Sequence, residues 1–235
     1  MLGAGASWPY GFPLGTGLRD AIRSLHKVRD DNDRLPLYDK CGASLTDLRD
    51  LGREFLYSGV KSIDAFLEKH PSLVDTGKLV IAREICESEK PKDLIGQADD
   101  NWYEYLWDYM HRDIAQADYV RTNHIRFLTF NYDRSLEFFL YNAIKNTFRV
   151  PADAALGASQ GIKIMHIYGA VGDFHHADSA TARAYSPDLN MAKLRLAADG
   201  IKIIPNARGD EAVFQEARDW FNWAEDICFS RVRIR

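Results

Sequence analysis

Glycines and a serine near the start of the chain could bind a phosphate group. The stretch GAGAS at residues 3–7 follows only Met1 and Leu2. Glycines let the backbone turn tightly and approach a phosphate, whose charge is then met by backbone N–H groups. A phosphate-binding loop should follow a buried strand, and a plain turn has the same composition. The loop is therefore a candidate nucleotide site, and a simple turn is the alternative.

Two polar residues follow an apolar stretch in the middle of the chain. The run IRFLTF at residues 125–130 is typical of a buried strand, and Asn131 and Asp133 come directly after it. Ligands of parallel α/β sheets gather beyond the carboxyl ends of the strands. The position predicts a ligand-binding role for both side chains. It equally allows Asp133 to cap a helix that begins at Arg134.

His166 and Tyr168 could move a proton. Both lie in an expected strand over residues 162–168, just before Gly169. Residues i and i+2 of a strand face the same side, so the two side chains are predicted to point the same way. A neutral imidazole accepts a proton near pH 7, whereas a tyrosine with a pKa of about 10 is a poor base. A structural histidine is the alternative for His166.

The elements around these residues alternate between strands and helices. Strands are expected at residues 125–130, 162–168, 201–204 and 227–229, and helices at 15–29, 133–147 and 210–226. This order predicts a doubly wound, mostly parallel Rossmann-like α/β sheet. Residues 45–119 have an almost wholly helical pattern. We interpret them as a helical insertion into a single domain over residues 1–235.

Composition narrows the classes of partner. Thirty basic and 34 acidic residues give a net charge of −4. The chain thus has no excess of basic residues that would indicate nucleic-acid binding. No apolar run reaches the about 18 residues of a membrane-spanning helix, and no signal peptide is visible, so we expect a cytoplasmic protein. Cys41, Cys86 and Cys228 are far apart, which favours buried thiols over a zinc site or a disulfide. His175 and His176 have no third ligand at metal spacing, so no metal is expected.

The three motifs, in this order, resemble the sirtuin-like NAD-binding domains, in their zinc-free bacterial branch associated with phage defence. Residues 62–67 (SIDAFL) add to the resemblance, which covers most of the chain. It implies that the Gly loop wraps the pyrophosphate of NAD and that residues 11–13 cover the nicotinamide ribose. The cofactor-binding residues that it implies are Gly3, Ala4, Gly5, Ser7, Phe12, Pro13, Asn131, Asp133 and Gly169.

The chain departs from the family pattern at several points. The His-Gly pair of sirtuins is Tyr168-Gly169 here, and His166 lies two residues earlier. The glutamine of the family's Gln-Asn-x-Asp motif is Phe130, and the zinc-ribbon cysteines are missing. Residues 230–235 (SRVRIR) stand where the family usually continues an apolar strand into a Gly-containing turn.

The resemblance implies an NAD hydrolase that gives nicotinamide and ADP-ribose. Asn131 would orient the ribose and a water molecule, Asp133 would hold the carboxamide, and His166 or Tyr168 would assist proton transfer. The missing zinc module favours hydrolysis over deacylation. The expected role is NAD depletion during phage infection, triggered by a protein activator or by homo-oligomerisation. The alternative is a non-catalytic module that binds NAD, ADP-ribose or a protein partner.

Overall fold

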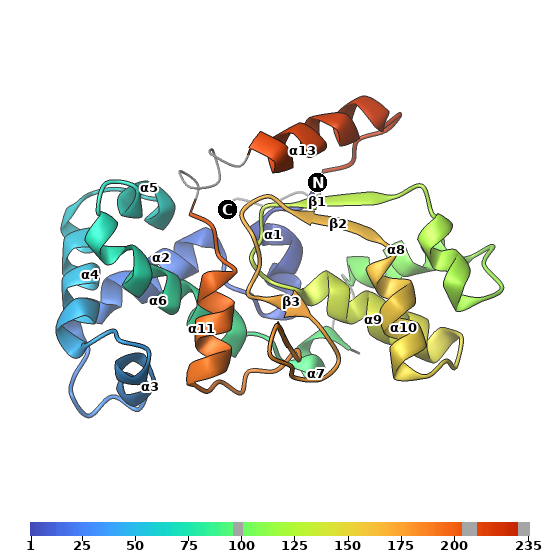
Figure 1. Cartoon of the computed structure of the whole chain (residues 1–235). Helices are drawn as coiled ribbons and strands as arrows, with labels where there is room; N and C mark the ends of the chain where they lie inside the picture. The colour runs from blue at the N-terminus through green and yellow to red at the C-terminus, as the bar shows by residue number, and fades with distance from the viewer. Residues whose placement is uncertain (96–100, 204–210, 230–235) are drawn as a thin grey trace.

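Two short parallel strands lie at the centre of the molecule (Figure 1). The computed structural model describes residues 1–95, 101–203 and 211–229, and in it β1 (Arg126–Thr129) pairs with β2 (Lys163–His166). Leu2 forms a parallel bridge beside β1. Its N–H donates to the carbonyl of Leu128 at 2.9 Å, and its own carbonyl accepts from the N–H of Phe130 at 3.1 Å. The start of the chain and both strands are therefore parallel neighbours.

The chain is a mixed α/β protein, but the described residues do not form the predicted four-stranded sheet. The prediction of a strand at 201–204 is wrong for residues 201–203. These residues form no strand, and Ile201 makes one isolated antiparallel bridge to Gly169. Gly169 has φ +74° at this bridge, outside the extended conformation of a strand, and a Cβ atom added to it would lie 2.0 Å from the carbonyl oxygen of Gly200. Residue 204 lies outside the described residues. A separate parallel pair joins β3 (Asp173–Phe174) to β4 (Ala182–Arg183).

The strand expected at residues 227–229 is also wrong. The segment has no regular secondary structure, and Ile227 and Phe229 are 46% and 67% exposed. No apolar burial is gained there that would offset the cost of ordering a strand. Cys228 is exposed, contrary to expectation, whereas Cys41 and Cys86 are buried free thiols as predicted. The carbonyl of Cys228 accepts a hydrogen bond from the Met1 amino group at 2.5 Å.

One side of the molecule is a group of helices, seen at the left of Figure 1. The expected helix at 15–29 is α2 followed by a 3-10 turn, η2 (Leu25–Lys27). Helix α4 begins at a capping box, in which the Ser44 hydroxyl accepts from the N–H of Asp47 and the Asp47 carboxylate accepts from the N–H of Ser44. The helices on this side are α2 (Gly15–Ser24), α3 (Leu35–Lys40), α4 (Leu45–Tyr57), α5 (Ile63–Leu67), α6 (Val74–Glu87) and α11 (Met191–Asp199).

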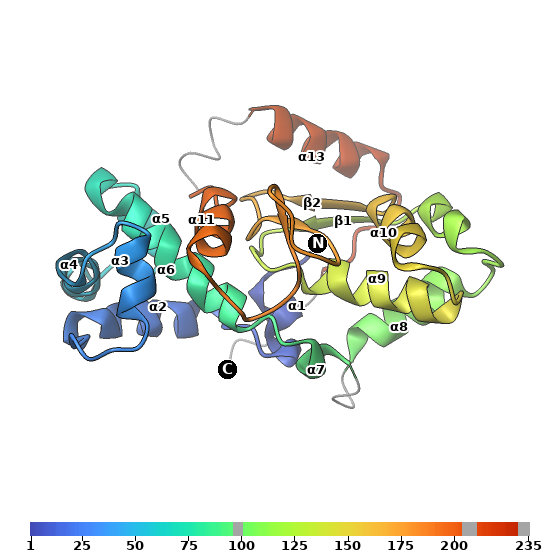
Figure 2. The same ribbon diagram turned by 60° about the horizontal axis from the view of Figure 1, so that its bottom comes forward.

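Other helices surround the strands. Figure 2 shows α9 (Ser135–Thr147) on one face of β1 and β2 and α13 (Glu211–Trp223) on the opposite face. Helix α9 begins two residues later than predicted, after Asp133. The remaining elements are α1 (Ala4–Ser7), η1 (Trp8–Tyr10), η3 (Pro71–Leu73), α7 (Pro91–Leu94), α8 (Trp102–His111), η4 (Ala117–Thr122) and α10 (Ala152–Gln160).

The helical stretch over residues 45–119 contributes to both sides of the molecule. Helix α6 packs against α11, which comes much later in the chain, while α8 packs against α9 beside the strands. One large hydrophobic cluster contains buried residues from all of these helices. Among the residues described, no helix combines the length and the apolar character that crossing a membrane requires.

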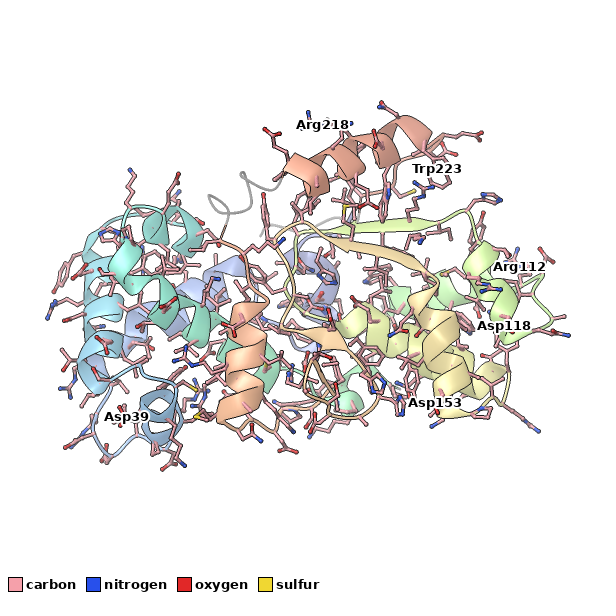
Figure 3. The ribbon with its side chains drawn as sticks, viewed as in Figure 1. Asp39, Arg112, Asp118, Asp153, Arg218 and Trp223 are labelled. Atoms are coloured by element: carbon pink, nitrogen blue, oxygen red, sulfur yellow. The ribbon has the colours of Figure 1, made fainter. Side chains whose placement is uncertain are left out.

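Helix α13 covers its face of the strands through a small apolar cluster. Leu128, Met165, Ile167 and Ala217 are its buried members. At the far end of the helix, the guanidinium of Arg126 lies 3.9 Å from the centre of the Trp223 ring, while Arg218 is exposed (Figure 3). The buried contacts between β2 and α13 are therefore apolar.

Candidate functional site

The Gly loop and the Asn131 loop meet at the carboxyl end of β1. The side-chain Nδ2 of Asn131 donates to the carbonyl of Gly3 at 3.0 Å and to the hydroxyl of Ser7 at 3.0 Å. The backbone N–H of Asn131 donates to Thr129 Oγ1 at 3.1 Å. Both amide hydrogens of Asn131 are thus engaged, and the orientation of the side chain is fixed. Its Oδ1 has no hydrogen-bond partner in the part of the chain that the structure describes, so it can accept a hydrogen bond from a ligand.

The side chain of Asp133, two residues after Asn131, is buried in the interior. Its Oδ1 accepts from the backbone N–H of Ser135 at 3.1 Å and from the Ser135 hydroxyl. Burial raises the pKa of Asp133, although hydrogen bonds from Ser135 and Ser7 act in the opposite direction. The Tyr103 hydroxyl lies 2.7 Å from Ser135 Oγ and extends the network. The carboxylate therefore contacts the first residue of α9, although the N-cap position is Arg134 and has no side-chain capping hydrogen bond, and it is 93% covered rather than open to a ligand.

His166 lies at the end of β2 between two hydrogen-bond acceptors. Its Nδ1 is 2.8 Å from the carbonyl oxygen of Asn131, and its Nε2 is 2.6 Å from Oε1 of Glu137. A carbonyl oxygen and a carboxylate oxygen only accept, so an imidazolium, in which both ring nitrogens donate, is the form that satisfies both partners. Burial alone would lower the pKa of His166, but the Glu137 carboxylate and the hydrogen bonds to Glu137 and Asn131 outweigh it and raise the pKa.

Sequence reasoning did not select Glu137. It lies in the first turn of α9, on a helix whose buried residues are mostly apolar. Only the packing of α9 against β2 brings its carboxylate to His166. Its place in the turn after the Asn-Tyr-Asp motif is the single sequence feature that could have drawn attention to it.

The prediction that His166 and Tyr168 share a strand face is wrong. Strand β2 ends at His166, and the chain then turns, with the N–H of Gly169 donating to the His166 carbonyl at 3.2 Å. Gly169 has φ +74°, a left-handed conformation that glycine adopts without strain. The turn moves Tyr168 to the α13 side, where it packs against the cluster of Met165 and Ile167. His166 contacts α9 on the other side.

The remaining residues of the predicted site hold backbone or core positions. Phe12 is buried and Pro13 is half-buried. Gly3 is extended, with φ −123°, and Ala4 and Gly5 are half-buried in the short helix α1. The left-handed glycine of this segment is Gly11, with φ +85°, which ends η1. Gly169 is required for the turn after β2 and for the close approach of Gly200.

A hydrogen bond ties the Asn131 loop to the helical side of the molecule. The Tyr132 hydroxyl donates to Oδ1 of Asp64 at 2.9 Å. Asp64 lies in α5, within the SIDAFL stretch, behind an N-cap at Ser62. Burial raises the pKa of Asp64, and the hydrogen bond from Tyr132 opposes this shift. The Asn131 loop and the stretch over residues 62–67 are therefore in direct contact.

A surface hollow of about 410 Å³ lies next to His166. Its walls come from the end of α10, from β2 and from α13. Its charged and polar lining residues are Gln160, Lys163, His166 and Glu216, with Trp220 as the aromatic wall. His166 therefore borders the hollow and also contacts the Asn131 loop.

Metal-binding geometry is not found among the described residues. No group of three or more His, Cys, Asp or Glu side chains there could hold a metal ion. His176 stacks with His175 and lies 3.6 Å from the carboxylate of Asp153, which is at the surface on α10 (Figure 3). Among the described residues, no further side chain joins His175, His176 and Asp153 in a group that could hold a metal ion.

The chain matches no protein-family model, no curated protein and no solved structure with which it was compared. The assignment of function therefore depends on the motifs and on the way in which the fold brings them together.

Proposed function

We propose that the chain binds NAD at the carboxyl end of β1 and cleaves the bond between nicotinamide and ribose, with nicotinamide and ADP-ribose as products. The observation that carries the proposal is the hydrogen bonding of the Asn131 side chain to Gly3 and Ser7. These partners are 128 and 124 residues away in the sequence. Two motifs that the resemblance assigns to one NAD site thus contact each other directly.

The orientation of Asn131 suits this reaction. Nδ2 is fixed by its two acceptors, and Oδ1 is available to accept from a ribose hydroxyl or from the attacking water. In the reaction, the bond from the ribose C1′ to the nicotinamide nitrogen breaks, the water oxygen bonds to C1′ and one proton is released. A neutral acceptor next to the developing oxocarbenium ion stabilises its positive charge.

The parallel arrangement of Leu2, β1 and β2 supports a Rossmann-like site. We infer that the pyrophosphate lies against the backbone N–H groups at the start of α1, because the Gly loop there follows a segment parallel to β1. The biological role that accompanies this activity is cytoplasmic NAD depletion in defence against phage. A protein activator or a second copy of the chain would trigger it.

The direct test is release of nicotinamide from NAD by the purified chain, compared with Asn131→Ala. We expect the variant to lower the rate by about 100-fold or more, because the ribose and the water lose their orientation. The free energy of unfolding should fall by only about 1–2 kcal/mol, since two hydrogen bonds of about 1 kcal/mol each are lost. The matched control is Asn146→Ala, whose exposed side chain bonds within α9.

Two outcomes would contradict the assignment. Full activity in Asn131→Ala would show that the residue does not act on the ribose. A loss of folded protein in this variant alone would show that Asn131 is a structural residue whose bonds to the Gly loop stabilise the fold.

A non-catalytic NAD-binding or ADP-ribose-binding module is the second candidate, and the state of His166 favours it. Both nitrogens of His166 donate hydrogen bonds, and Tyr168 lies on the opposite face of β2, so neither is placed as a base beside Asn131. Calorimetry distinguishes the candidates. Binding of NAD without release of nicotinamide would establish the module.

A further inference from the structure

The pair of His166 and Glu137 connects α9 to the loop that carries Asn131. The side chains of His166 and Glu137 are 13% and 19% exposed, so solvent screens their interaction only in part. The ring bridges two elements, with Glu137 on α9 at one nitrogen and the Asn131 backbone at the other. The Asn131 side chain in turn contacts Gly3 and Ser7. A continuous series of hydrogen bonds thus runs from α9 to the Gly loop.

We propose that Glu137 is a positioning residue: it holds His166 as an imidazolium whose other N–H clamps the Asn131 carbonyl, and this clamp places the Asn131 side chain against the Gly loop. The part of the proposal that concerns NAD rests on the proposed function of Asn131. The charge state of His166 and the order of the loop do not depend on it.

Three other charged groups lie near His166. Asp133 lies in the loop before α9 and favours the imidazolium through its charge. Lys163 of β2 and Glu216 of α13 line the same surface hollow and have opposite charges. Glu137 is the carboxylate in direct contact, and its ion pair with the ring is a charge-assisted hydrogen bond.

The clamp has a definite dependence on pH. When His166 loses its proton, a neutral ring keeps one N–H and cannot donate to both partners. The charged carboxylate is the stronger acceptor, so the hydrogen bond to the Asn131 carbonyl is lost. NAD binding should therefore weaken as the pH rises through the raised pKa of His166. A general base would give the opposite result, with activity that falls below about pH 6 because the ring becomes charged.

The experiment is an NMR titration of the histidine side chains in the full chain, with His166→Gln used to assign the signal. We compare the wild-type chain with Glu137→Gln, which keeps the shape and removes the charge. The proton affinity of His166 should fall by about tenfold or more in Glu137→Gln. In Glu216→Gln, the matched control from the same hollow, it should stay within about twofold. In calorimetry, Glu137→Gln should weaken NAD binding by about tenfold, and Glu216→Gln should leave it unchanged.

The outcomes separate this proposal from the proposed function. An unchanged His166 titration in Glu137→Gln overturns the clamp, and so does a lowered proton affinity with unchanged NAD affinity. If the wild-type chain binds no NAD, the proposed function fails. The clamp is then measured from the rate at which the Asn131 side-chain amide exchanges hydrogen with water. This rate should rise in Glu137→Gln and not in Glu216→Gln. An equal rate in the two variants overturns the clamp. If Glu137→Gln does not fold, Glu137→Asp, which keeps the charge, takes its place and should give smaller changes of the same sign.

Discussion

At the scale of single residues, most polar side chains around the Asn131 loop hold the loop itself. Ser7 accepts from Asn131, and Asp133 accepts from Ser135 in the interior. His166 donates to the backbone of the same loop. A buried polar group that has its partners costs little, whereas one without them costs about 1–3 kcal/mol, so these side chains depend on one another. Asn131 Oδ1 has no partner among the described residues, and the proposed function assigns it to a ligand.

Asp133→Asn tests the internal role of this carboxyl group. A carboxyl pKa that is raised in the folded state means that folding favours the protonated form. The stabilisation is complete below the pKa of the unfolded chain, about 3.9, and is lost as the pH rises through the folded pKa. Asparagine does not ionise, so it loses no stability as the pH rises, and its side-chain oxygen still accepts from Ser135. We therefore expect Asp133→Asn to be at least as stable as the wild-type chain at pH 7.

Urea denaturation at several pH values measures the effect. The stability of the wild-type chain relative to Asp133→Asn should decline from pH 3 upward. Asp133→Ala should cost about 1–3 kcal/mol, because Ser135 and Ser7 lose their acceptor. Asp153→Asn, at a side chain that is 93% exposed, is the control and should show neither effect. A large loss of stability at pH 7 in Asp133→Asn would show that the carboxylate itself is needed.

At the scale of elements, the Gly loop is a helical turn. Gly3 is extended and Gly5 belongs to α1, so neither glycine is needed for a left-handed conformation. Gly5 lies between Gly3 and Ser7, which both accept hydrogen bonds from the Asn131 side chain. If a pyrophosphate lies there, a single added methyl group obstructs it.

Gly5→Ala is therefore expected to separate folding from binding. Alanine is favoured over glycine in a helix by about 1 kcal/mol, so the melting temperature should be unchanged or higher. NAD affinity in calorimetry should fall by about tenfold or more. Gly157→Ala in α10, where an added Cβ atom meets nothing within 4 Å, is the control and should leave NAD affinity unchanged. Unchanged affinity in Gly5→Ala would show that the loop is only a turn.

At the scale of the whole molecule, a buried ion cluster joins segments that are distant in sequence. Glu89, just after α6, accepts from both Nε and Nη2 of Arg134, which precedes α9. Arg183 of β4 also donates to Glu89. The three side chains are at most 1% exposed. One carboxylate thus holds two guanidinium groups in the interior, between the helical side and the strands.

Glu89→Gln should destabilise the whole fold. Removal of the carboxylate leaves two buried cations without a counter-charge, and breaking a buried pair in this way costs about 3–5 kcal/mol. Glu87→Gln is the control, because Glu87 pairs with Arg34 and Arg83 at a partly exposed position and should cost about 1 kcal/mol or less. Chemical denaturation measures both. Equal small costs would show that water or another group compensates the arginines.

The sequence by itself determined the local elements and the candidate residues. The apolar run at 125–130 and the period of residues 133–147 predicted β1 and α9, because burial of a strand or of one helix face is encoded in neighbouring residues. The position of Asn131 after β1 followed from the same pattern. In the structure, Leu2 forms a parallel bridge to β1, and the Asn131 side chain donates to Gly3.

Tertiary structure alone decided the pairing of the elements. Residues 201–203 and 227–229 are apolar enough for strands, but a strand also needs an edge to pair with, and the sequence does not give its position. The side that Tyr168 faces depends on the turn at Gly169, and the charge of His166 depends on Glu137 of α9. Such contacts join residues that are far apart in the chain, so local periodicity contains no information about them.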